Sequence, residues 1–184
     1  MMTILKIDSS ITGEASVSRL LTGAIIAQLR ARAPDARVIA RDLVASPLSH
    51  LTLGGSGDAD VLDEFLAADT IVIGAPMYNF TVPSQLKAWI DRLVIAGKTF
   101  RYTESGPVGL LTNKRVIIAI ARGSLYGAGA PASALEHAQT YLNGVFSFLG
   151  LIPEFVIADG VGISPELREA GLASGLAEIE RLAA

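Results

Sequence analysis

The chain of 184 residues contains no cysteine and only two histidines, His50 and His137. Without cysteine it has no disulfide framework, no thiolate nucleophile and no cysteine-bound zinc. Two histidines far apart in the sequence do not indicate a histidine-rich metal site. These absences favour chemistry carried by a bound organic cofactor over chemistry carried by a metal or a cysteine.

Charge of either sign is also scarce. Charged residues make up 18% of the chain, against about 25% in an average domain. The net charge is −3 and no block of basic residues occurs, so the electrostatic footprint of a nucleic-acid-binding protein is missing. The low charged fraction instead indicates additional buried surface, such as a subunit interface.

Long apolar runs are absent as well. The longest, Val116–Ala121, is far shorter than the roughly 18 residues that indicate a membrane span. The chain starts with a strand-like run containing Lys6 and Asp8 rather than with a signal peptide. We therefore expect a soluble, cytoplasmic protein with no membrane or nucleic-acid partner, and the length predicts a single domain over residues 1–184.

What the chain does have is a regular alternation of strand-like and helix-like segments. Apolar and β-branched runs predict strands at Thr3–Asp8, Arg37–Leu43, Thr70–Gly74, Arg115–Ala121 and Phe155–Ala158. Apolar residues at helical spacing predict helices at Ser16–Arg32, Asp60–Asp69, Ser84–Ala96, Ser133–Leu149 and from Ser164 toward Ala183. The pattern predicts an α/β three-layer sandwich, in which a five-stranded parallel sheet of flavodoxin-like order 2-1-3-4-5 carries helices on both faces.

Several of these helix boundaries depend on cap residues. Ser133 and Glu136 have the spacing of a capping box at the start of the fourth helix. Gly97 and Gly150 stand where the third and fourth helices are expected to end. Ser164, followed by a proline, predicts the start of the last helix.

Ligands of such a sheet bind beyond the carboxyl ends of its strands, where three loops are of interest. Asp8–Ser18 is rich in serine and leads into a helix whose free backbone N–H groups suit a phosphate. Arg19 is the only cation nearby, so such a site would hold a phosphate by dipoles and hydrogen bonds rather than by charge pairing. Ala75–Ser84 exposes large apolar side chains that suit a flat hydrophobic ligand or a subunit contact, and its Asn79 tolerates unusual backbone dihedrals. Ala121–Ala132 is rich in glycine and is interpreted as a flexible lid.

Together these segments resemble the FMN-dependent NADH azoreductases, flavodoxin-like enzymes that reduce quinones and azo dyes. The most specific match is Ala75–Phe80 (APMYNF), with Gln85-Leu86-Lys87 shortly after it. Further matches are Thr99–Pro107 (TFRYTESGP), Arg122–Gly123 and the spacing of Ser10 with Ser16-Val17-Ser18. The resemblance extends over nearly the whole chain.

The resemblance implies a role for each of these segments. The FMN phosphate would be held by Ser10, Ser16, Val17 and Ser18. The isoalloxazine would be lined by Met77, Tyr78, Asn79 and Phe80, and its pyrimidine side would be closed by Ala121, Arg122, Gly123 and Ser124. The substrate cavity, at the interface of a homodimer, would receive Tyr102 and Phe148.

The resemblance also implies a reaction. One tightly bound FMN per subunit would take hydride at N5 from NADH or NADPH and pass it on to a quinone or azo compound in a ping-pong sequence. The protein would supply stacking, orientation and electrostatics, and no metal or catalytic side chain of its own. Both nicotinamide donors stay open because the sequence shows no basic pocket for a 2′-phosphate.

The chain departs from the family pattern in three places. Ala121 stands where the family usually has serine, and Ser124 stands where it usually has a second glycine. The segment 46–69, with its glycine-rich turn at 54–57, is shorter than its counterpart in the family. We expect this shortening to affect the substrate cavity and the rim of the dimer and to leave the FMN loops intact.

Two other functions fit parts of the sequence. A flavodoxin-type electron carrier would bind FMN without turning over a small substrate, but such carriers tend to be strongly acidic, unlike this chain. A flavin-free module would use the apolar loops to bind a protein partner, but it would not need a serine-rich start to its first helix. The reductase is therefore the favoured prediction.

Overall fold

The computed structural model describes residues 1–53 and 59–182 and is built on one parallel sheet. Its five strands are β1 (Thr3–Asp8), β2 (Arg37–Asp42), β3 (Thr70–Pro76), β6 (Arg115–Ala121) and β7 (Pro153–Ala158). They lie in the order β2-β1-β3-β6-β7. Counted along the chain within this sheet, that is the predicted order 2-1-3-4-5.

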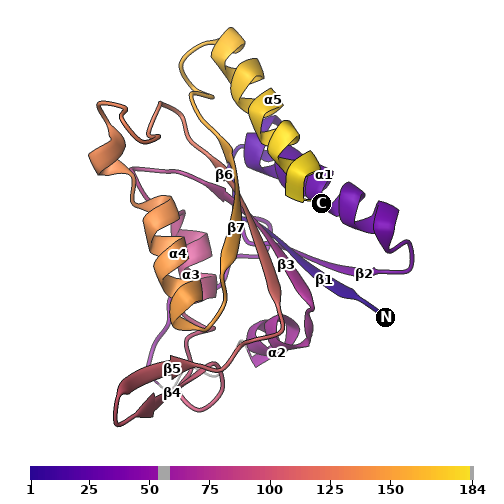
Figure 1. Ribbon diagram of the computed structural model, residues 1–184, viewed down its shortest axis with the longest axis vertical. Helices are drawn as coiled ribbons and strands as arrows, with labels where there is room; N and C mark the ends of the chain where they lie inside the picture. The colour runs from indigo at the N-terminus through magenta and orange to yellow at the C-terminus, as the bar shows by residue number, and fades with distance from the viewer. Residues whose placement is uncertain (54–58, 183–184) are drawn as a thin grey trace.

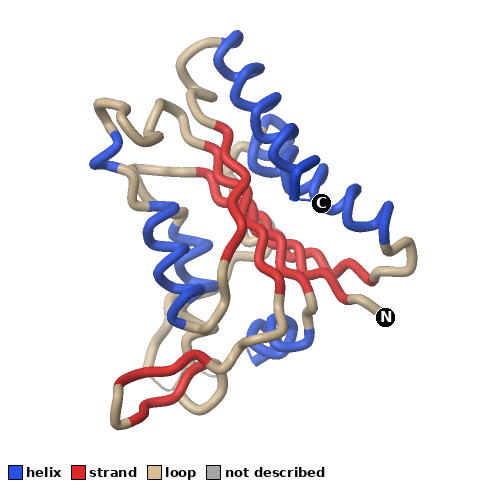
Figure 2. Tube along the Cα trace, in the orientation of Figure 1, coloured by secondary structure: helices blue, strands red, loops and turns tan. Residues whose placement is uncertain are grey.

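Helices cover both faces of the sheet (Figure 1). One face carries α1 (Val17–Arg32) and α5 (Pro165–Leu182), and the other carries α2 (Ala59–Ala67), α3 (Ser84–Ile90) and α4 (Ala138–Phe148). Because side chains of a strand alternate between its faces, Ile71 and Ile73 pack with one set of helices and Val72 packs with the other. Figure 2 shows the resulting three layers, which explain why the central strands are apolar throughout.

The first and last helices begin and end close to their predicted positions. Ser164 caps α5, since its Oγ accepts a hydrogen bond of 3.2 Å from the Leu167 N–H. Ala183 and the predicted turn at 54–57 lie outside the described residues. Over the part of the chain that is described, no helix is both long and apolar enough to cross a membrane.

The third helix is shorter than predicted and ends at Ile90 instead of Ala96. The backbone tightens at this end, where the N–H groups of Arg92 and Leu93 bond to carbonyls three residues earlier. Beyond it, the Thr99 Oγ1 donates to the Leu93 carbonyl at 2.6 Å and accepts from the Ile95 N–H at 3.0 Å. These bonds occupy backbone groups that a helix extending to Ala96 would pair internally. The proposed cap, Gly97, does have a left-handed φ of 79°, but it belongs to the turn that follows.

The predicted capping box at the fourth helix is also wrong. Residues Ser133–Leu135 form a short 3-10 helix, η2, and α4 begins only at Ala138. Glu136 caps α4 directly, because its carboxylate accepts from the N–H groups of Gln139 and Thr140. The predicted end at Gly150 is confirmed, with φ 92° and the Leu151 N–H returning to the Phe146 carbonyl.

A two-stranded antiparallel hairpin, which the sequence analysis missed, stands apart from the main sheet. It consists of β4 (Phe100–Thr103) and β5 (Gly106–Gly109). Gly109 packs so closely on the end of α4 that an added Cβ would lie 2.2 Å from the Gly150 nitrogen. The hairpin is therefore fixed beside the last turn of α4. In Figure 1 it lies at the bottom of the view, opposite the segment that follows β6 at the top.

A partly buried charge network fixes the first loop to the sheet. Arg19, in the first turn of α1, donates to both carboxylate oxygens of Asp42 at 2.8 and 2.9 Å and to the Ser10 carbonyl at 3.0 Å. Asp8 lies 3.8 Å from the same guanidinium and accepts from the Thr22 hydroxyl. Since Asp8 and Asp42 are register partners that end β1 and β2, one guanidinium holds two strand ends and a loop.

The network makes stability depend on pH. The hydrogen bond from Arg19 lowers the pKa of Asp42 from 3.8 to about 2. A carboxyl with a depressed pKa stabilises the fold above its ordinary pKa, and that contribution is lost as the pH falls through the depressed value. We expect Asp42→Asn to lower the free energy of unfolding at neutral pH. The difference in free energy of unfolding between Asp42→Asn and the parent should become smaller as the pH falls from about 4 to about 2.

Urea unfolding across that pH range measures this difference. Asp35→Asn, at an exposed turn position, is the control and should change little at any pH. A deficit of Asp42→Asn that stays constant from neutral to acid pH would contradict the role given to Arg19.

Candidate functional site

The three loops singled out in the sequence start side by side at the carboxyl edge of the sheet. Pro76 pairs with Ala121 at the ends of β3 and β6, and Asp8 pairs with Gly74. The hydrogen bond from the Met77 N–H to the Ala121 carbonyl, 2.8 Å long, continues this pairing into the loops. The parallel register thus brings the loops together, as predicted.

Serine hydroxyls gather at the start of α1. Ser16 caps the helix by accepting a 3.2 Å hydrogen bond from the Arg19 N–H, and its Oγ lies 3.1 Å from that of Ser18. Ser10, Ser16, Val17 and Ser18 are all buried. The backbone N–H groups of the first helical turn have no partner within the helix, so this corner offers hydroxyl and amide donors to an anion.

A cavity of about 450 Å³ lies over this corner. The first loop supplies Ser10, Thr12, Ala15, Ser16, Val17 and Ser18; the other predicted loops supply Pro76, Met77, Tyr78, Ala121 and Gly123. Two more lining residues, Val161 and Arg168, follow β7 and were not predicted. The signal that could have found them is the same topological rule, since β7 ends at the same edge of the sheet.

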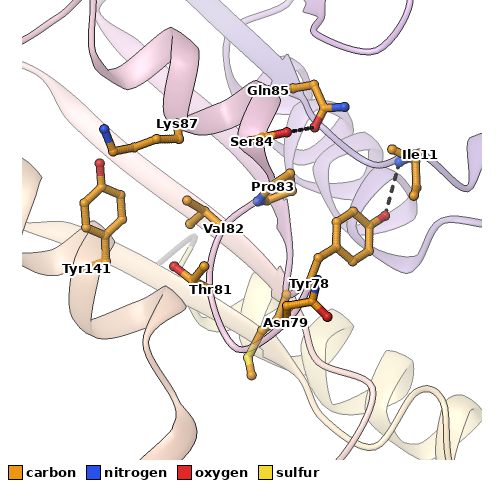
Figure 3. Close-up of a pocket in the computed structure, with 11 residues that line it drawn as sticks. Ile11, Tyr78, Asn79, Thr81, Val82, Pro83, Ser84, Gln85, Lys87 and Tyr141 are labelled. Atoms are coloured by element: carbon orange, nitrogen blue, oxygen red, sulfur yellow. Dashed lines mark hydrogen bonds between the residues drawn. The ribbon is translucent and has the colours of Figure 1, made fainter. Parts of the chain in front are cut away.

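Tyr78 connects the first loop to the second. Its hydroxyl lies 3.2 Å from the Ser10 Oγ and accepts a 3.1 Å hydrogen bond from the Ile11 N–H (Figure 3). On the far side of Tyr78 lies a second cavity of about 930 Å³. It is lined by Ile11, Met77, Tyr78, Asn79, Thr81, Val82, Pro83, Ser84, Gln85, Lys87 and Tyr141.

The second cavity has one charged group among its described lining residues, Lys87, beside several neutral polar ones. Lys87 lies 2.5 Å from Asp91, in an ion pair. Burial, together with the charge of Asp91, raises the pKa of the Tyr141 phenol to about 12. The Tyr141 phenol therefore stays protonated even at alkaline pH and can donate a hydrogen bond into the cavity.

The second loop turns sharply at two left-handed residues. Asn79 has φ 47°, as its residue type allowed us to expect, and Phe80 has φ 74°, which is unusual for an aromatic residue. Tyr78 and Thr81 close the turn by pairing their N–H and C=O groups. Phe80 packs edge to face on Tyr126, with ring centroids 6.4 Å apart, so it contacts the glycine-rich segment and lines neither cavity.

Two of the four predicted residues of the third loop, Arg122 and Ser124, do not reach the cavity over α1. The Arg122 guanidinium is buried, forms an ion pair with both oxygens of Asp159 and lies 3.8 Å from Glu136. Ser124 instead accepts a backbone hydrogen bond from the Gly160 N–H. Ala121 and Gly123 are the members of this loop that reach the cavity.

Tyr102 and Phe148 lie away from both cavities. Tyr102 is 75% exposed on β4, and Phe148 is at the end of α4, where its ring centroid is 4.8 Å from that of Phe100. Phe148 lines a shallow hollow with residues of α4 and Val94. A single chain therefore does not bring these two aromatic residues to the site at its own carboxyl edge.

Comparisons with known proteins agree with this architecture. A family model described as the flavodoxin-like fold matches residues 2–183. The chain is 51% identical to an FMN-dependent NADH:quinone oxidoreductase of Bradyrhizobium diazoefficiens, over 95% of this chain and 96% of that protein. It is 53% identical to the enzyme of the same description from Sinorhizobium fredii, over 94% and 92% of the two chains. Both alignments are longer than the 184 residues of this chain, so each relative contains residues without a counterpart here.

Solved structures give the same result. An azoreductase from Bacillus anthracis superposes with a TM-score of 0.89 at 30% identity, over 100% of this chain and 99% of that one. A second azoreductase from the same species, FMN-dependent and solved in complex with FMN, has a TM-score of 0.84 at 25% identity, with both chains covered completely. About half of the sequence is thus shared with the two oxidoreductases and the fold with the two azoreductases, and the chain belongs to the flavodoxin-like family of FMN-dependent NADH:quinone oxidoreductases and azoreductases.

Proposed function

We propose that the protein is an FMN-dependent oxidoreductase that uses NADH or NADPH to reduce quinones and azo compounds. The observation that carries the proposal is the cavity in which the serines of the first loop, Met77 and Tyr78 of the second, and Ala121 and Gly123 of the third meet. It combines hydroxyl and amide donors for a phosphate with an adjoining apolar wall for a ring. Relatives of about half identity are named FMN-dependent NADH:quinone oxidoreductases, and structural neighbours are named azoreductases. Because the nicotinamide donors are supplied inside the cell, the proposal includes a cytoplasmic location.

The donor set fits the parts of FMN. Ser10, Ser16, Val17 and Ser18 would hold the phosphate, and Met77, Tyr78, Asn79 and Phe80 would lie along the isoalloxazine. Ala121, Arg122, Gly123 and Ser124 would close the pyrimidine side. Because the Arg122 side chain is committed to Asp159, this third group would act through its backbone.

When bound, FMN supplies the hydride chemistry, with one molecule per subunit. The chain supplies position and exclusion of water. The buried serines and the start of α1 fix one end of the ligand. The left-handed turn at Asn79 and Phe80 presents backbone groups to the other end, and the apolar wall limits access of solvent to the ring. In this proposal no side chain of the site acts as a general acid or base in the hydride transfer.

The first test is spectroscopic. The purified protein, reconstituted with FMN, should show a bound-flavin absorption band that bleaches on addition of NADH without oxygen and returns when a quinone is added. A bound flavin that NADH leaves unchanged would instead indicate an electron carrier. Failure to bind FMN at all would indicate a module that uses its apolar loops for a protein partner.

The phosphate role makes a sharper prediction. Ser18→Ala removes a hydroxyl while leaving the cap at Ser16 in place. A hydrogen bond to a charged group contributes about 1.5–3 kcal/mol, so FMN affinity should fall roughly ten- to a hundred-fold. Fluorescence titration of the apoprotein measures the dissociation constant. Ser147→Ala, exposed on α4, is the matched control, and equal FMN affinity in Ser18→Ala would contradict the assignment.

We also propose a homodimer in which Tyr102 and Phe148 of one chain complete the substrate cavity of the other. The low charged fraction and the exposed apolar residues Tyr102, Val108 and Ile152, on and beside the hairpin, support it. Light scattering should give the mass of two 19.2 kDa chains, and Tyr102→Asp should shift it toward one. Leu20→Asp, an exposed apolar position on α1, is the control. A single-chain mass for the parent would reject the dimer.

A further inference from the structure

Arg168 reaches the site from the far end of the sequence. It lies in the first turn of α5, and its side chain crosses to the short 3-10 helix η1 (Gly13–Ala15), where Nη2 donates a 2.5 Å hydrogen bond to the Ala15 carbonyl. It lines the same cavity as the three serines. The start of α5 and the start of α1 therefore border one space.

Arg168 differs in charge from everything else around that space. Among the described residues that line the cavity, it is the one with a formal charge. Arg19, the cation nearest to the serine loop in the sequence, does not line the cavity, and Asp42 and the Ser10 carbonyl accept hydrogen bonds from both of its terminal nitrogens. A charged contact to a phosphate at this corner would therefore come from another residue.

The guanidinium of Arg168 is available for that contribution. Over residues 1–53 and 59–182, no carboxylate lies within ion-pair distance of it, and its hydrogen bond is the one to Ala15. The carboxylate of its neighbour Glu166 instead accepts hydrogen bonds from its own backbone N–H and from the Ser164 hydroxyl at the start of α5, which lower the pKa of that carboxyl. Of the five N–H donors of an arginine, most thus remain free for a bidentate contact with an anion.

We infer that Arg168 is the cationic anchor of the FMN phosphate. The inference rests on the proposed function and adds to it the charged partner that the serine loop lacks. The serines and the backbone N–H groups of α1 bind through dipoles, whereas Arg168 binds through charge, so it sets the preference for the phosphorylated flavin over riboflavin. A second consequence is that the Arg168 side chain, which already joins α5 to η1, would also join α5 to the bound phosphate.

Two variants separate this role from a purely structural one. Arg168→Gln removes the charge but keeps an N–H donor for the Ala15 carbonyl. Arg168→Lys keeps the charge. Arg181→Gln, in the last turn of α5, is the control, and thermal unfolding of all variants verifies that they fold. Each apoprotein is titrated with FMN and with riboflavin at low and at high salt.

We expect Arg168→Gln to weaken FMN binding roughly ten- to a hundred-fold and to leave riboflavin binding unchanged. Arg168→Lys should recover most of the FMN affinity, and the salt dependence of FMN binding should be smaller in Arg168→Gln than in the parent. Arg181→Gln should match the parent for both flavins.

Three other outcomes would overturn the inference. Equal FMN affinity in Arg168→Gln and the parent would show that Arg168 makes no charged contact with the phosphate. An equal loss for FMN and riboflavin would make Arg168 a tether of η1 without a phosphate role. A parent protein that binds neither flavin would overturn the proposed function and this inference together, whereas the first two outcomes leave the proposed function standing.

Discussion

The ionic contacts of Arg19 are the constraint on which the site depends. This guanidinium joins the ends of β1 and β2 to the carbonyl of Ser10, and so it determines where the serine loop leaves the sheet. A partly buried cation with two carboxylate partners is costly to separate from them. The loop is therefore fixed from behind, and its hydroxyls are left facing the cavity. Arg19 therefore has a structural role, and in the inference above the charged contact with the ligand comes from Arg168.

Most of the fold could be predicted because its signals are local. Strands β1 and β6 coincide with the apolar runs at Thr3–Asp8 and Arg115–Ala121, and the alternation with helices determines the sheet order. The errors occur where a distant group overrides a local pattern. Thr99 binds the backbone of Leu93 and Ile95, which a helix extending to Ala96 would need, and the hairpin of β4 and β5 depends on packing between Gly109 and the end of α4. The alternation in β4, which places Phe100 and Tyr102 on one face, extends over only four residues, and β5, with the sequence GPVG, has no such alternation.

The site, like the fold, could be predicted in part. Its loops could be predicted because parallel strands deliver their carboxyl ends to one edge, whatever the details of packing. The direction of individual side chains could not be predicted. Arg122 has the sequence position of a ligand contact, but Asp159 and Glu136 draw its guanidinium into the protein. Arg168 has no motif at all, and its relation to Ala15 is a contact across 153 positions of chain.

That long separation has a consequence for biosynthesis. The ribosome makes the N-terminal part of a chain first, and structure can begin to form there during synthesis. The hydroxyls of the site are then present before Val161 and Arg168, which close the cavity from the other side. A nascent chain therefore holds only part of its binding wall until the start of α5 has also been made and has packed against α1. The cavity is thus a product of the folded sheet as a whole and cannot form within the first loop and helix alone.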